Sequence, residues 1–260
     1  MKILPLFKSH YSIGRSILTL ERSGNKRSDY PISIFDLAKE ADLQEIILID
    51  NSFSGFLEAY TNSQEEKIKL IFGLRVTMCC DIEKKSDDEI SKQHKIVILA
   101  KNTEGYKRLI KISTLACLKG FYYEPRIDFK SVVKEWDNND LQLAIPFYDS
   151  FLFYNALYGR RCVPDFSFTT PVFFIEHNFL PFDSLIEKTI LSYSKTEFEV
   201  IPTKTICYST RKDFLAYLTF RCINNRSMNS KITLNEPNQE HLSSAEFCFE
   251  AWKESNEKNG

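Results

Sequence analysis

The sequence predicts an α/β fold in which short buried strands alternate with amphipathic helices. Seven short, nearly continuous apolar runs recur along the 260 residues, and helix-like segments lie between them. The composition, 43% hydrophobic with a formal net charge of -1, is that of an ordinary globular protein. Strands that are covered on both faces read as continuous apolar runs, because neither face needs polar side chains. Strands that alternate with helices indicate parallel βαβ units, and therefore an open doubly wound sheet or a closed barrel.

The expected strands are short and rich in β-branched and aromatic residues, as strands of about five or six residues in a covered sheet usually are. In chain order they cover residues 2–7, 45–50, 68–73, 95–100, 141–146, 171–176 and 198–203.

Four segments between these runs have the spacing of amphipathic helices. The segment 33–41 opens with Ser33 and carries Asp36 three residues later, which is a capping-box pattern. The segment 102–118 places its apolar residues at helical spacing, and the segments 182–193 and 210–223 do the same. The sequence therefore predicts helices over these four ranges.

The chain reads as a single domain over residues 1–254. The strongly charged stretch at 81–95 interrupts a strand pair, and we interpret it as a solvated hairpin or loop. A carboxyl-terminal extension follows at 225–254, and the residues 255–260 are expected to form a frayed polar tail. No apolar run approaches the roughly 20 residues that a membrane-spanning helix needs, and the amino terminus is too interrupted for a secretory signal.

Seven cysteines, an odd number without a C-x-x-C pair, indicate reduced thiols and a cytoplasmic protein. The adjacent residues Cys79 and Cys80 would point to opposite faces of a strand, which suits packing better than shared metal ligation. A net charge close to zero excludes a generally basic nucleic-acid coat, although a local basic face stays possible.

Searches for motifs with known chemistry identify no catalytic constellation. The sequence has no glycine-rich nucleotide or phosphate loop, no H-E-x-x-H and no G-x-S-x-G. The four histidines, His10, His94, His177 and His241, are far apart in the sequence. Glu176 and His177 at the end of a strand could form a base with an orienting carboxylate. Adjacent strand residues face opposite ways, so a structural role is favoured.

One segment, residues 94–128 (HKIVILAKNTEGYKRLIKISTLACLKGFYYEPRID), closely resembles part of a known domain family. This family is the polymerase and histidinol phosphatase (PHP) domain, found at the amino terminus of bacterial DNA polymerase III alpha subunits. Similar segments follow in the family's order, so the resemblance spans residues 2–250 and is weakest over 146–195. These segments are 9–17, 46–60, 71–76, 200–223 and 233–237. The resemblance implies a distorted TIM-like barrel of seven βα units.

The same resemblance implies where metal ligands would lie. Active members hydrolyse phosphoesters with metal ions, which His and carboxylate ligands hold at the carboxyl ends of the barrel strands. Of the family's ligands only Asp50 is clearly kept here, and Ser16 and Ser52 replace glycines beside the ligands. The vestigial metal-site positions are Leu6, Lys8, Arg15, Asp50, Asn51, Arg75, Thr205 and Cys207.

Three of the replacements are cationic, which suggests a substitute for the metal charge. The hypothesis is that Lys8, Arg15 and Arg75 occupy the vacated site and pair with Asp50, because a buried charge without a partner is costly. In one alternative these side chains turn to solvent. In another the basic barrel mouth binds a phosphate or a nucleic-acid backbone without cutting it.

The resemblance therefore implies a non-catalytic, metal-free PHP-like domain that acts in DNA replication. It would be a structural and docking module for the rest of a DNA polymerase III alpha subunit or for its proofreading exonuclease subunit. We expect no catalytic residue, no metal and no cofactor, and the polymerase active site does not lie in these residues. One alternative is a phosphoesterase or nuclease of the PHP superfamily that depends on zinc, manganese or magnesium. Another is a stand-alone binding or regulatory protein.

Two aromatic-rich segments, 153–159 and 173–182, lie in the most divergent region. An interface patch there is one interpretation, and buried core is the favoured one because aromatic side chains supply much of a core's apolar area.

Overall fold

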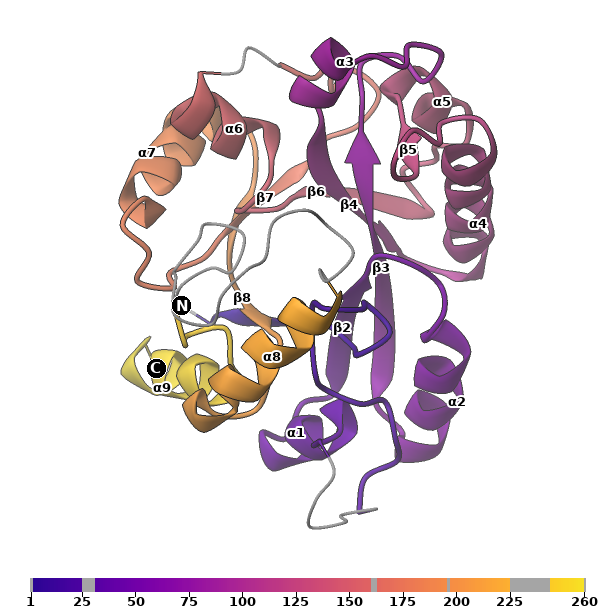
Figure 1. Ribbon diagram of the computed structural model, residues 1–260. Helices are drawn as coiled ribbons and strands as arrows, with labels where there is room; N and C mark the ends of the chain where they lie inside the picture. Colours follow the sequence, from indigo (N-terminus) through magenta and orange to yellow (C-terminus); the bar gives the residue numbers. More distant parts are fainter. Residues whose placement is uncertain (1, 25–30, 160–162, 196, 225–243, 260) are drawn as a thin grey trace. The chain divides into compact units, whose positions relative to one another are not determined.

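The structure is a computed structural model that describes residues 2–24, 31–159, 163–195, 197–224 and 244–259. Its strands and helices alternate along most of the chain (Figure 1), which confirms the predicted α/β class. The chain divides into two compact units. The first unit contains residues 1–71, 176–183 and 202–260, and the second contains residues 72–175 and 184–201.

The first unit is built on three parallel strands, β1 (Leu4–Phe7), β2 (Glu45–Asp50) and β8 (Val200–Ile206). Strand β1 lies between the other two, with Leu6 opposite Ile47 on β2 and opposite Thr205 on β8. The helices of this unit are α1 (Ile34–Glu40), α2 (Phe56–Glu66), the 3-10 turn η1 (Arg211–Asp213), α8 (Phe214–Asn224) and α9 (Phe249–Asn259).

The second unit contains β3 (Lys69–Met78), β4 (His94–Ala100), β5 (Arg126–Ile127), β6 (Leu141–Ile145) and β7 (Val172–Ile175). Its helices are α3 (Asp87–Ser91), α4 (Thr103–Leu118), α5 (Phe129–Lys134), α6 (Phe151–Tyr158) and α7 (Asp183–Ser194). Strands β3 and β4 are antiparallel, and so are β4 and β6, whereas β6 and β7 are parallel. The expectation of parallel pairs throughout was therefore wrong for this unit.

Local sequence explains where the predicted helices begin. The Ser33 side chain accepts a hydrogen bond from the Phe35 backbone N–H, and the Asn102 side chain accepts one from Gly105. Such caps satisfy N–H groups that have no partner inside the helix. Helix α7 covers the segment predicted at 182–193, and η1 with α8 covers the segment predicted at 210–223.

Other elements differ from the expectation or were missed. The charged stretch 81–95 connects the antiparallel strands β3 and β4, as a hairpin connection would, but it contains the short helix α3. Helix α9 continues through Ser255 as far as Asn259, where a frayed tail was expected. The description as one domain over 1–254 stays a prediction. The segment 233–237, His241 and Cys162 lie outside the described residues.

The aromatic-rich segments are largely core in each unit. Phe151, Phe153 and Phe173 are buried in the second unit, and Phe173 packs on Tyr193 with ring centroids 5.7 Å apart. Tyr158 in the second unit and Phe179 in the first unit are exceptions, because they are 51% and 85% exposed.

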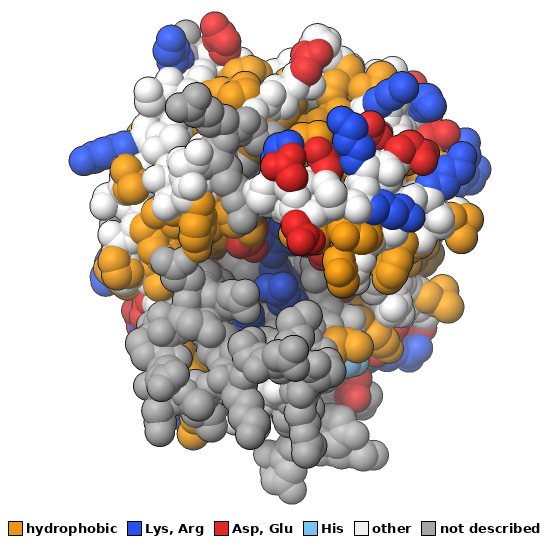
Figure 2. Space-filling view, turned by 45° about the horizontal axis from the view of Figure 1, so that its top comes forward, with side chains coloured by type: hydrophobic (Ala, Val, Ile, Leu, Met, Phe, Trp, Pro, Cys, Tyr) orange, Lys and Arg blue, Asp and Glu red, His pale blue; other side chains and the backbone are white. Residues whose placement is uncertain are grey.

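Charges of both signs lie on one face of the second unit (Figure 2). On the right-hand side of Figure 2, where α4 and α5 lie, positive and negative side chains are interspersed with hydrophobic ones. Within the described residues no helix is long and apolar enough to span a bilayer. The six described cysteines are free thiols; Cys79 and Cys80, which follow β3, are buried and exposed respectively.

Candidate functional site

Four of the predicted positions lie side by side at the carboxyl ends of β1 and β8. Leu6 pairs with Thr205 in the parallel register, and the Lys8 backbone N–H donates to the Ile206 carbonyl at 3.2 Å. Side chains two residues apart on a strand face the same way. The register places Leu6 of β1 beside Thr205 of β8. Lys8 and Cys207 directly follow these two strands and so lie at the same end.

Asp50 ends the neighbouring strand β2 and is only 1% exposed. Its carboxylate accepts hydrogen bonds from the Ser9 hydroxyl at 2.5 Å, the Ser12 hydroxyl at 2.8 Å and the Ser9 backbone N–H at 3.0 Å. The Ser12 hydroxyl also accepts from the Asn51 backbone N–H at 3.0 Å. The kept carboxylate therefore fastens the loop after β1 to the end of β2.

Burial raises the pKa of Asp50 above its ordinary value. The hydrogen bonds from Ser9 and Ser12 and the positive charge of Lys8 act in the opposite direction, because they favour the ionised form. Lys8 is therefore close enough to act on Asp50 electrostatically, while the direct hydrogen bonds come from serines.

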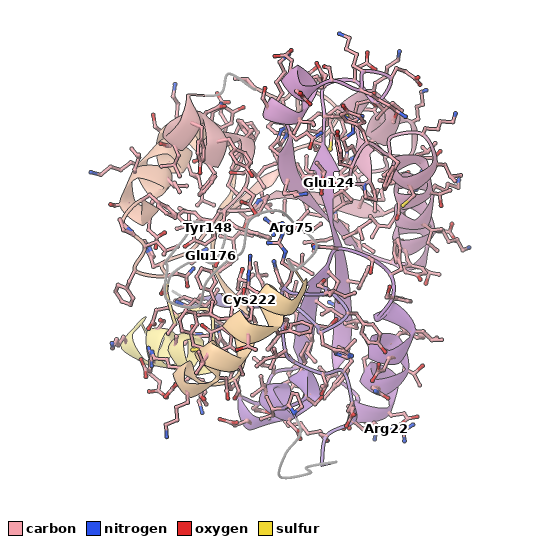
Figure 3. All side chains as sticks on the ribbon, viewed as in Figure 1. Arg22, Arg75, Glu124, Tyr148, Glu176 and Cys222 are labelled. Atoms are coloured by element: carbon pink, nitrogen blue, oxygen red, sulfur yellow. The ribbon has the colours of Figure 1, made fainter. Side chains whose placement is uncertain are left out.

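A second buried carboxylate, Glu176, contacts a predicted position. Glu176 directly follows β7 and accepts hydrogen bonds from the Thr205 hydroxyl at 2.7 Å, the Thr205 backbone N–H at 3.1 Å and the Asn178 side chain at 3.1 Å. It is 4% exposed, and Figure 3 labels it. These contacts agree with the structural role favoured for Glu176, whereas its contact with Thr205 was not foreseen. A Glu directly after an apolar strand was the sequence signal for it.

Cys207 is buried, and the charges of two cations act on its thiol. Burial raises the pKa of its thiol, and the charges of Lys8 and Arg221 oppose that rise. Arg221 on α8 is 4% exposed and donates to the Tyr217 hydroxyl at 3.0 Å. The Cys207 carbonyl accepts from the Ser16 hydroxyl at 2.9 Å. Arg221 was not among the predicted positions, because it belongs to helix α8 and not to the strand-end motifs of the sequence.

The positive charge of Arg15 acts on Tyr217, which lies on the same helix as Arg221. Burial raises the pKa of Tyr217 to about 12, and the charges of Arg221 and Arg15 counteract that rise. The first unit thus gathers the cations Lys8, Arg15 and Arg221 around Cys207 and Tyr217.

Arg75 belongs to the second unit and has a partner of its own there. Its Nη2 lies 2.5 Å from Asp149 Oδ2 and 3.4 Å from the Tyr148 carbonyl oxygen, and Figure 3 labels Arg75 and Tyr148. The hypothesis that Arg75 pairs with Asp50 therefore needs correction, because its ion pair is with Asp149.

The residues at these positions do not fit a metal cluster of the PHP kind. Such clusters need imidazole and carboxylate donors. Leu6 has no donor atom, Lys8 and Arg15 are cations, and Asp50 is committed to serine hydroxyls. Across the ranges that the structure describes, no three His, Cys, Asp or Glu side chains are grouped so that they could hold a metal ion.

Comparisons with known proteins agree on the family. Residues 27–152 match the model of the PHP domain. The DNA polymerase III subunit alpha of Borreliella burgdorferi is 36% identical over 98 residues, which are 36% of this chain and 8% of that protein. The corresponding subunits of Helicobacter pylori and Aquifex aeolicus are 35% identical over 98 residues and 33% identical over 105 residues. These matches cover 37% of this chain in both cases, and 8% and 9% of the relatives.

The chain thus spans less than a tenth of the curated relatives that it matches. The match, with the order of strands and helices, confirms the predicted resemblance and its fold class, the distorted TIM-like barrel of PHP domains. Residues 27–152 of the chain are therefore similar to the PHP domain, and part of the chain is similar to DNA polymerase III alpha subunits.

Proposed function

We propose that this chain is a non-catalytic, metal-free PHP-like domain that works with a DNA polymerase III alpha polypeptide in DNA replication. In this proposal it stabilises the polymerase and offers a docking surface to the polymerase or to its proofreading exonuclease subunit. The cytoplasmic location expected from the cysteines is part of the same proposal.

The observation that carries the proposal is the chemistry of the strand ends. A metal-dependent phosphoesterase needs several ligands that keep free lone pairs directed at the ions. Asp50 is the clear family ligand that is kept, and its oxygens accept three hydrogen bonds from Ser9 and Ser12. Thr205 occupies another ligand position, and its hydroxyl donates to Glu176. These side chains hold the loops together with bonds that a metal ion would have to displace.

The relatives support the part of the proposal that concerns replication. The matched proteins are DNA polymerase III alpha subunits, and this chain corresponds to a small part of each. The small size of the matched part supports a role as a module of a larger assembly. Fold alone does not decide function, so the proposal depends on the site chemistry together with the relatives.

The first experiment measures metal content and hydrolysis on the same purified chain. After incubation with zinc and with manganese, followed by removal of loosely bound ions, we expect far less than one ion per chain. With a generic phosphomonoester and manganese, we expect no turnover above that of Asp50→Ala. Tight stoichiometric metal, or metal-stimulated turnover that Asp50→Ala abolishes, would instead support the phosphoesterase alternative.

The second experiment tests docking directly. The immobilised chain is offered the DNA polymerase III alpha polypeptide and the exonuclease subunit of its own organism, separately. We expect one of them to bind specifically. Binding of neither contradicts the docking role and favours a stand-alone protein with another partner.

A further inference from the structure

We draw no further inference here: the strongest candidate, the side-chain cluster of the first unit in which Lys8, Arg15 and Arg221 lie around Cys207 and Tyr217, belongs to the site already described.

Discussion

Two charged side chains in the first unit are held in opposite ways. Asp50, almost fully buried, is held by hydroxyl and backbone donors of Ser9 and Ser12. The Arg211 side chain, 33% exposed, is held by the carboxylates of Glu246 and Glu254 with four contacts of 2.8 to 2.9 Å. Neutral hydrogen-bond donors thus stabilise Asp50 at the end of β2. Ion pairs to Arg211 instead attach the carboxyl-terminal segment.

The two kinds of interaction differ in how strongly dissolved salt weakens them. Hydrogen bonds from neutral donors to a buried carboxylate act over short distances and are barely affected by salt. Ion pairs near the surface are weakened by salt and gain strength when several charges form a network. Asp50 should therefore matter for local packing, and Arg211 should control how firmly α9 is attached.

The largest effect is expected when Asp50 loses its donors. In Ser9→Ala/Ser12→Ala the buried carboxylate keeps only the Ser9 backbone N–H of its three hydrogen bonds. Hydrogen bonds to charged groups contribute about 1.5–3 kcal/mol each, so the free energy of unfolding should fall by about 3 kcal/mol or more. Denaturant unfolding followed by circular dichroism measures this change.

A third substitution distinguishes the stability lost with the hydrogen bonds from the cost of a buried carboxylate that has lost its donors. Adding Asp50→Asn to the double variant removes the buried charge, so part of the lost stability should return. If the double variant unfolds like the wild type, Asp50 is not held by these serines and the comparison with Arg211 fails.

The fold was predictable where one segment decides its own structure. The spacing of Leu109 and Ile112 indicates a helix, and both residues are fully buried on α4. Strand direction was not predictable in the same way, because an apolar run such as 95–100 looks alike in parallel and antiparallel pairs. Strand β5 has only two residues, too few to produce a pattern.

The site was predictable in its positions and only partly in its contacts. The resemblance placed Leu6 and Thr205 at neighbouring strand ends, and the strand register brings them together. The partners of Asp50 and Thr205 could not be read from the sequence, because Ser9 is 41 residues from Asp50 and Glu176 is 29 residues from Thr205. Such contacts depend on how the strands pair.

A smaller effect is expected at Arg211. In Arg211→Ala the contacts to Glu246 and Glu254 are lost, and we expect the free energy of unfolding to fall by about 1–2 kcal/mol, since the network is bidentate but partly exposed. Backbone amides of α9 should exchange faster with solvent deuterium. Added salt should narrow the gap between the wild type and the variant.

Lys253→Ala is the matched control for Arg211→Ala. Lys253 also lies on α9 and pairs with Glu40 at 2.8 Å, with side chains 38% and 50% exposed. A single exposed pair contributes about 0–1 kcal/mol, so this variant should change stability less than Arg211→Ala. An equal loss of unfolding free energy in both variants would mean that the Arg211 network stabilises the chain no more than a single exposed ion pair does.

The smallest expected effect concerns how stability changes with pH, which should have opposite signs for Asp50 and for Glu254. Burial raises the pKa of Asp50 in the folded chain, so the folded state holds that proton more tightly than the unfolded state does. Between the unfolded and folded pKa of Asp50, rising pH should therefore lower the stability of the wild type relative to Asp50→Asn. For Glu254, the hydrogen bond from Arg211 lowers the pKa. Its contribution is present above the unfolded pKa and is lost as pH falls through the folded pKa.

The two difference curves should therefore slope in opposite directions. Unfolding free energies measured from about pH 3 to about pH 7 cover the range in which carboxyl groups titrate. The stability of the wild type minus that of Asp50→Asn should decrease as pH rises, and the stability of the wild type minus that of Arg211→Ala should increase. Curves of the same sign would mean that the hydrogen bonds from Ser9 and Ser12, together with the charge of Lys8, outweigh desolvation at Asp50.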